Sequence, residues 1–388
     1  MRIKYLRLVS LVVLRALIRL GLLQIYELSI KGRITQVVVH VEPMIRKKLI
    51  RLTLFPPVLI IVESGVTPNI ALREYFSKRV VWVDRKTAFG LKALFVDLAI
   101  SKVREPGIAR LIKRRGTQWE LSPCRRIEDS WRDETNELLK EMGVETDKPI
   151  ALVALRYATY YERLRMNRPE SEIGYETNPD TFIRNPDIMT YGKALEQFVE
   201  MGVQPIHFGK DATPVPIELR HLIVDYSSNF RLDRGDLLLA SRCLMMVTGG
   251  SGAWVLPSMF NRPVLHTNCY YNFVSGVSRR DRFMPQLLWS EAESRYLTFR
   301  EMVGFGGTYS YSQNCERDGV YPIKNSSEEL AAAIGEMFSR IYGTFVEDKS
   351  DQQMQDEFDK IKALTKPDSF QDAQIATVFL RKYSHLLS

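Results

Sequence analysis

The chain has 388 residues, which is too long for one ordinary hydrophobic core and suits two domains of roughly 150 to 200 residues each. Its composition, 45% hydrophobic and 26% charged, is typical of a folded globular protein and excludes a disordered one. The formal net charge of +8 predicts a surface that attracts anions such as nucleic acid, phospholipid headgroups or a phosphorylated small molecule.

The cysteines argue against a disulfide framework and against a structural zinc site. They are widely spaced and form neither a CxxC pair nor a Cys/His cluster at zinc spacing. We therefore expect no metal and a reducing, cytoplasmic compartment. The four cysteines are Cys124, Cys243, Cys269 and Cys315.

Residues 1–30 are apolar but are interrupted by basic side chains, and we expect them to form an amphipathic helix. On a helix, Lys4, Arg7, Arg15 and Arg19 fall within one arc, and leucines and valines occupy most of the remaining surface. This pattern is typical of a helix that lies in a membrane interface, and the uncharged runs are too short for a membrane span. The alternative is a terminal helix that packs on the protein's own core.

The region that follows alternates between short β-branched runs and mixed helical segments, which indicates a parallel sheet. We expect residues 31–145 to form an N-terminal, acceptor-side domain of Rossmann-like type. Its charge-rich end, from 101 to 148, is expected to connect the domains and to close with a helix over 129–142. The predicted strands of this domain are 35–42, 56–64 and 77–85.

The second half repeats the α/β alternation more clearly. We expect residues 146–345 to form a doubly wound domain, whose ligand would sit at the carboxyl ends of its strands. Residues 346–388 are expected to be helical. The predicted strands are 149–156, 203–209, 243–249 and 262–268, and the predicted helices are 186–202, 234–242, 252–260, 326–343 and 372–387.

The stretch "VTGGSGAWVLPSMFNRPVLHTN", residues 247–268, places a glycine-rich turn between a strand and a helix. It lacks the lysine of a nucleoside-triphosphate P-loop and the last glycine of the dinucleotide fingerprint. Small residues before a helix let an anion approach free backbone N–H groups, so the turn could bind phosphate. It could equally serve only to reverse the chain, and the turn alone does not decide between these interpretations.

The wider text "VDYSSNFRLDRGDLLLASRCLMMVTGGSGAWVLPSMFNRPVLHTN" resembles the donor-binding half of glycosyltransferases of the GT-B fold. Residues 149–268 are similar to a group of bacterial glycosyltransferases through Arg156–Tyr157, through "DTFIRNPDIMTYGKALEQFVEMG" and through the stretch just quoted. The same residues are more loosely similar to the fucosyltransferases of this fold. The resemblance implies two Rossmann-like, doubly wound domains that face a cleft.

The resemblance also implies roles for individual residues. Arg156 would hold the donor pyrophosphate and act in catalysis by stabilising the departing nucleoside diphosphate, which a guanidinium does without a metal or other cofactor. Asp236 would orient the nucleotide half of the donor, and Ser251 with the Gly252 amide would bind a phosphate oxygen. We expect Gly209, Lys210 and Gly250 to complete the donor site.

An inverting transferase also needs a base that takes the proton of the acceptor hydroxyl. Three residues at predicted strand ends of the N-terminal domain are candidates: His40, Glu63 and Asp84. Glu63, directly after the apolar run "VLIIV", is our first choice as the second catalytic residue.

Together these features predict a glycosyltransferase of the hexosyl- or deoxyhexosyl-transferase class. It would move a sugar from a nucleotide sugar to a lipid-linked or polysaccharide acceptor in bacterial cell-surface glycan biosynthesis. We expect it to be peripheral on the cytoplasmic face of the membrane and not to bind nucleic acid. Two alternatives stay open, a noncatalytic carbohydrate-assembly protein with a degenerate GT-B fold and a basic nucleic-acid-binding protein.

Overall fold

A computed structural model describes most of the second half of the chain and shorter pieces of the first. The chain divides into two compact units, Met1–Pro123 and Cys124–Ser388. The described residues are 13, 16–17, 23–29, 34–35, 37–39, 41–42, 45, 58–64, 69–84, 129–157, 185–210, 212–269, 276–305, 315–364 and 373–388.

The first unit contains a three-stranded parallel sheet in the order β1-β2-β3. A helix, α3 (Ile70–Ser77), lies between the last two strands in sequence and buries Leu72 and Phe76. It begins at Asn69, whose Oδ1 accepts a hydrogen bond from the Leu72 N–H at 2.8 Å. The strands are β1 (Leu23–Ser29), β2 (Val58–Ser64) and β3 (Val80–Asp84). The predicted strand over 56–64 is confirmed at 58–64, and the one over 77–85 is confirmed at 80–84.

Two predictions for this unit are wrong. Residues 23–29, which we expected within the N-terminal helix of residues 1–30, form strand β1 and pair with β2 residue for residue. The predicted strand over 35–42 is helical wherever the structure describes it. Val37, Val38, Val39 and Val41 are all buried in this helical segment, so tertiary packing decides over the β-propensity of the valines.

Among the helices that the structure describes, none is both long enough and apolar enough to cross a membrane. The predicted interfacial helix lies mostly outside the described residues; within 1–22, only Val13, Ala16 and Leu17 are described, and they are helical.

The second unit is built on a seven-stranded, fully parallel sheet in the order β13-β9-β8-β7-β4-β5-β6. From β4 the chain first adds strands on one side and then, from β7, on the other side. This is the strand order of a Rossmann-type sheet, and it confirms the predicted α/β, doubly wound class for this unit. The strands are β4 (Ile150–Leu155), β5 (Gln204–His207), β6 (Val224–Asp225), β7 (Met245–Gly249), β8 (Val264–Cys269), β9 (Arg282–Pro285) and β13 (Gln374–Ile375).

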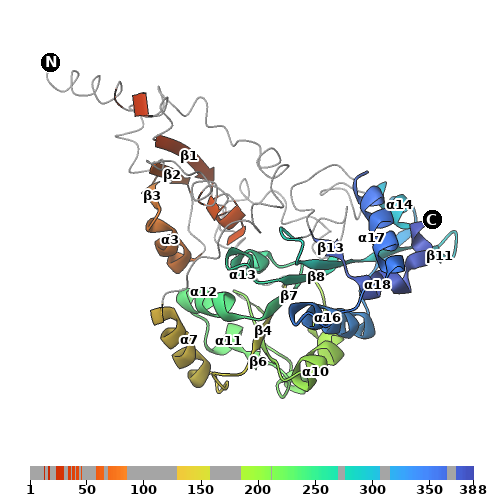
Figure 1. Ribbon diagram of the computed structural model, residues 1–388, viewed down its shortest axis with the longest axis horizontal. Coiled ribbons are helices and arrows are strands. Elements are labelled where there is room, and N and C mark those ends of the chain that lie inside the picture. The colour runs from red at the N-terminus through yellow and green to blue at the C-terminus, as the bar shows by residue number, and fades with distance from the viewer. Residues whose placement is uncertain are drawn as a thin grey trace. The chain divides into compact units, whose positions relative to one another are not determined.

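Helices cover both faces of this sheet, and all six residues of β4 are buried as a result. Figure 1 shows one helix pair, α10 and α16, side by side, and a second group in which α12 lies between α7 and α13. The bounds are α7 (Asp129–Glu141), α10 (Gly192–Glu200), α12 (Asp233–Arg242), α13 (Val255–Met259) and α16 (Ser327–Ile341). Shorter elements are the 3-10 turns η3 (Ile188–Tyr191), η4 (Ile217–Leu219) and η5 (Gly252–Trp254) and the helix α11 (Tyr226–Asn229).

Helix α7 belongs to the second unit, so the division after Pro123 comes earlier than the predicted domain boundary at 145. The physical reason is its contact with α12. Arg234 donates two hydrogen bonds of 2.8 Å to the carboxylate of Glu134, and its guanidinium lies 4.3 Å from the centre of the Trp131 ring. The helix predicted over 129–142 is thus confirmed as α7, which packs against α12.

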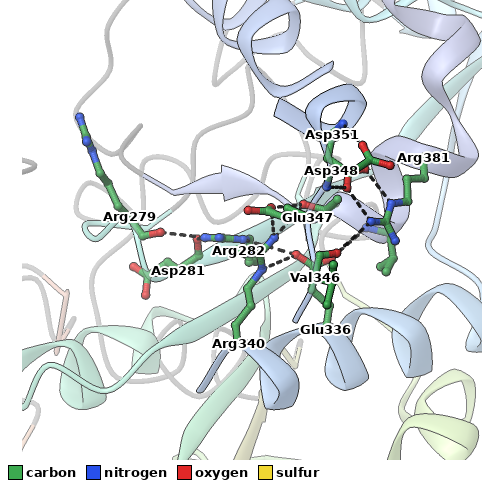
Figure 2. A network of polar contacts seen from close by, with 12 residues as sticks. Arg279, Asp281, Arg282, Glu336, Arg340, Val346, Glu347, Asp348, Asp351 and Arg381 are labelled. Atoms are coloured by element: carbon green, nitrogen blue, oxygen red, sulfur yellow. Dashed lines mark hydrogen bonds and ion pairs between the residues drawn. The ribbon is translucent and has the colours of Figure 1, made fainter. Parts of the chain in front are cut away.

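The described C-terminal residues, 346–364 and 373–388, pack within the second unit through a network of ion pairs (Figure 2). Its centre is Glu336 of α16, whose fully buried carboxylate lies 2.7 Å from Arg340 Nε and 3.5 Å from Arg282 Nε. Glu336 also accepts the backbone N–H of Val378 at 2.9 Å. The predicted helix over 372–387 starts instead with strand β13, followed by α18 (Thr377–Lys382) and η6 (Ser384–Leu387); α17 (Lys349–Lys362) precedes them.

A small antiparallel sheet in the order β11-β10-β12 and one short helix complete the unit. These elements are β10 (Leu287–Ser290), β11 (Arg295–Tyr296), α14 (Phe299–Val303) and β12 (Val320–Ile323).

Candidate functional site

The carboxyl ends of β4 and β7 meet where the strand order of the large sheet reverses, and ligands of such sheets bind at this point. Arg156 directly follows β4, and the glycine-rich turn begins at Gly249, the last residue of β7. The Arg156 N–H donates to the Gly249 carbonyl oxygen at 3.0 Å, and Leu155 forms a β-bridge with Gly250. The two elements that the sequence singled out are thus direct neighbours.

Steric constraints require glycine at the first two positions of the turn, Gly249 and Gly250. A Cβ atom on Gly249 would lie 2.6 Å from Pro186 Cγ and 2.9 Å from the Tyr191 hydroxyl oxygen, which is too close for any side chain. Gly250 has a positive φ of 70°, a conformation that costs other residues free energy. Chain reversal therefore accounts for both glycines, whether or not an anion also binds here.

We expect Gly249→Ala to lower the free energy of unfolding by about 1–3 kcal/mol, because the added methyl group overpacks the turn. Urea denaturation followed by circular dichroism measures this change. The matched control is Gly335→Ala in α16, where nothing lies within 4 Å of the new Cβ and the higher helix propensity of alanine should leave stability unchanged or slightly raised. Equal stability of the two variants would contradict the steric account.

Ser251 lies beside these glycines, and its hydroxyl has a local partner. Its Oγ accepts the backbone N–H of Ala253 at 3.3 Å, while its carbonyl oxygen accepts the Thr248 hydroxyl at 3.2 Å. The predicted helix over 252–260 is the 3-10 turn η5 followed by the five-residue helix α13. Gly250 is exposed, and Ser251 and Gly252 are half-buried.

Arg156 is buried, with 4% of its surface exposed, and its Nη1 lies 3.5 Å from Asn185 Oδ1. Asn185 precedes Pro186, which packs against Gly249. The guanidinium is therefore held at the turn by the segment that leads into η3.

Asp236 lies in the first turn of α12, but its carboxylate is bound within the unit. It accepts hydrogen bonds from Arg231 Nη2 at 2.7 Å and from the Tyr226 hydroxyl at 3.1 Å, and only 4% of the residue is exposed. Burial raises the pKa of Asp236 to about 6, against the opposing effect of the Arg231 charge. Its predicted role in orienting the nucleotide stays a prediction.

The other predicted site residues lie at strand ends. Gly209, with a φ of 146°, and the exposed Lys210 follow β5, the neighbour of β4. Glu63 is the second-last residue of β2 in the first unit, where it pairs in register with Asp84 of β3. His40 lies outside the described residues.

A chain of three polar side chains, which the sequence does not single out, lies at the same sheet edge; His207 is fully buried, and Tyr157 and Asp225 are half-buried. The Tyr157 hydroxyl is 2.9 Å from His207 Nε2, and His207 Nδ1 is 3.0 Å from Asp225 Oδ1. His207 and Asp225 are the last residues of β5 and β6, and Tyr157 is the second residue after the end of β4. Their shared position at strand ends is a signal that the sequence contains. The sequence order alone does not show which strands are neighbours, so it could not show that the three side chains meet.

The charges of this chain follow from its hydrogen bonds. Burial alone would raise the pKa of Asp225, but hydrogen bonds from His207 and from the N–H groups of Val215 and Ser228 lower it to about 2. An ionised Asp225 accepts hydrogen bonds only, so His207 Nδ1 carries the proton. In the neutral imidazole, His207 Nε2 then accepts the Tyr157 O–H, which fixes the tyrosine beside Arg156.

We expect Asp225→Asn to destabilise the protein by about 1–3 kcal/mol at pH 7. Because the folded-state pKa of Asp225 is lowered from 3.8 to about 2, its stabilisation is present above about pH 4 and is lost as the pH falls toward 2. The difference in free energy of unfolding between Asp225→Asn and wild type should therefore become smaller as the pH falls from about 4 toward 2. Urea denaturation at pH 7, 4 and 3 measures it, and a difference that does not change with pH would show that ionisation of Asp225 is not involved.

Comparison with known proteins gives structural likenesses and no sequence match. No family model matches the chain, and no curated protein matches it. A structure of the Escherichia coli ADP-heptose lps heptosyltransferase II is similar with a TM-score of 0.43 and 13% identity, over 68% of this chain and 89% of that one. The glycosyl transferase family 9 protein from Veillonella parvula has a TM-score of 0.33 and 11% identity, over 64% and 80%. The E. coli heptosyltransferase WaaC with ADP has a TM-score of 0.31 and 12% identity, over 68% and 91%.

Proposed function

We propose that the protein is a glycosyltransferase that uses a nucleotide sugar, and that its second unit binds the donor. The observation that carries this proposal is the meeting of Arg156 with the turn at residues 249–252, at the carboxyl ends of β4 and β7. A doubly wound sheet offers its ligand crevice at this point, and the sequence supplies an arginine and small residues there. The resemblance of residues 149–268 to GT-B donor domains supports the same assignment.

The chemistry of glycosyl transfer fits these residues. The bond from the sugar to the nucleoside diphosphate breaks through an oxocarbenium-like state, and negative charge grows on the departing phosphate. The guanidinium of Arg156 would donate two parallel hydrogen bonds to that phosphate and stabilise the charge without a metal ion. The exposed backbone of Gly250 leaves room for an anion to approach.

The finer parts of the proposal concern the acceptor and the location. Glu63 would serve as the base that takes the acceptor proton, and the donor sugar would be a hexose or deoxyhexose, as in the fucosyltransferase-like likeness. The acceptor would be a lipid-linked or polysaccharide glycan of the bacterial surface. The basic, amphipathic residues 1–22 would bring the enzyme to the cytoplasmic face of the membrane.

A thermal-shift panel of UDP, GDP, CMP and TDP tests the proposal on the wild-type protein. One nucleotide should raise the melting temperature by several degrees when present at about 100 times its Kd, because this concentration adds about 2.7 kcal/mol to the stability. The corresponding nucleotide sugars are then tested for turnover. Stabilisation without turnover of any donor would favour a noncatalytic carbohydrate-assembly protein, and no stabilisation by any nucleotide would overturn the enzyme proposal.

A further inference from the structure

Lys324 stands between the end of β12 and the start of α16, and its side chain is exposed. Its Nζ donates a hydrogen bond of 2.7 Å to the backbone carbonyl oxygen of Asn185. An ammonium group has three N–H donors, so this contact leaves two for another partner. In the part of the chain that the structure describes, Lys324 forms no ion pair with a carboxylate.

The backbone around Lys324 is held firmly at the carboxyl end of β8. Its neighbour Asn325 exchanges two hydrogen bonds with Asn268: the Asn268 N–H donates to Asn325 Oδ1 at 2.6 Å, and the Asn325 N–H donates to Asn268 Oδ1 at 2.8 Å. Asn325 Nδ2 also donates to the Pro285 carbonyl oxygen at 3.0 Å. Both asparagines are buried, so Lys324 is presented from a fixed point at the edge of the sheet.

Lys324 and Arg156 both contact Asn185. Its carbonyl oxygen accepts from Lys324 Nζ at 2.7 Å, and its side-chain Oδ1 lies 3.5 Å from Arg156 Nη1. The next residue, Pro186, packs against Gly249 at the start of the glycine-rich turn. Two cationic side chains that are 168 positions apart in the sequence thus contact the same residue beside the turn.

We propose that Lys324 is a second cationic ligand for the donor's diphosphate. This inference rests on the proposed function and extends the donor site to a residue outside the sequence motifs. A diphosphate has two phosphoryl groups, and a single guanidinium engages one of them bidentately. The flexible, point-charged ammonium of Lys324 would engage the other. Arg156 and Lys324 together would then favour diphosphates over a single phosphate.

Isothermal titration of the full chain with inorganic pyrophosphate and with inorganic phosphate tests this inference independently of nucleotide or sugar. Lys324→Gln should weaken pyrophosphate binding about tenfold, as expected for the loss of one charge-assisted hydrogen bond, and should affect phosphate binding less. Lys324→Arg should retain most of the affinity. The matched control is Lys140→Gln, which removes one exposed positive charge near the end of α7.

The outcomes separate this inference from the proposed function. If wild type binds a nucleoside diphosphate and Lys324→Gln binds it and pyrophosphate equally well, the role of Lys324 is wrong and the function stands. If pyrophosphate binding depends on Lys324 but no nucleotide binds, the diphosphate site stands and the nucleotide-sugar function is wrong. An equal loss in Lys140→Gln, or no binding of pyrophosphate by wild type, would also overturn the role of Lys324. Unchanged melting temperatures of the unliganded variants establish that each is folded.

Discussion

Arg156→Ala is expected to weaken binding of the best nucleoside diphosphate by about 100-fold, because it removes a bidentate, charge-assisted pair of hydrogen bonds. If the protein turns over its donor, kcat should fall by about 10²–10³ as well, since the same guanidinium would stabilise the leaving group. Isothermal titration and donor-hydrolysis assays measure the two effects. Arg156→Lys should lie between wild type and Arg156→Ala, because it keeps the charge but loses the planar fork.

The control for this experiment is Arg300→Ala, which removes an exposed arginine from α14. It should leave nucleotide affinity unchanged. Arg156 is buried, so the fold of Arg156→Ala is checked by near-UV circular dichroism before binding is measured. A folded Arg156→Ala variant with wild-type affinity would remove Arg156 from the site.

Glu336→Ala is expected to lower the free energy of unfolding by about 3–5 kcal/mol, because it leaves the buried Arg282 without its compensating carboxylate. The same change removes the partner of Arg340 (Figure 2). It also removes the acceptor of the Val378 N–H, which joins α16 to the start of α18. Urea denaturation at pH 7 measures the loss.

Glu328→Ala is the matched control on the same helix. Glu328 pairs with Lys193 at 2.5 Å, but both side chains are mostly exposed, so little stability should be lost. Equal stability of the two variants would show that the ion pairs around Glu336 do not stabilise the packing of the C-terminal residues on the second unit.

The strands and helices of the second unit could be predicted because local sequence and burial agree there. β4 is buried on both faces and therefore appears as the continuous apolar run "IALVAL". α16 starts at Ser326 with a complete capping box formed with Glu329, and such a cap is specified by residues only three positions apart in the sequence. The parallel, doubly wound arrangement follows from the alternation of such segments.

Other elements could not be predicted, because contacts distant in sequence decide them. The valines at 37–39 and 41 favour a strand by local propensity, yet they are buried in a helical segment. Residues 23–29 continue the apolar pattern of the preceding segment, and only pairing with β2 makes them a strand. Likewise, β13 has two residues and exists through its pairing with β9.

For the site, the sequence named Arg156 and the turn but could not show that β4 and β7 are adjacent. It missed the chain from Tyr157 through His207 to Asp225, since these side chains meet only after three strands align. It also did not single out Lys324, whose ammonium group donates a hydrogen bond to the Asn185 carbonyl oxygen. In each case the residue types can be read from the sequence, but the order of strands that brings the side chains together cannot.

We propose that a nucleoside diphosphate binds where β4 and β7 end. A crystal structure of the wild-type protein with the nucleotide that stabilises it most tests this claim directly. The diphosphate should lie within hydrogen-bond distance of the Arg156 guanidinium and of the backbone N–H groups of residues 250–252. A fully occupied nucleotide elsewhere on the protein, with Arg156 and the turn unengaged, would contradict the account.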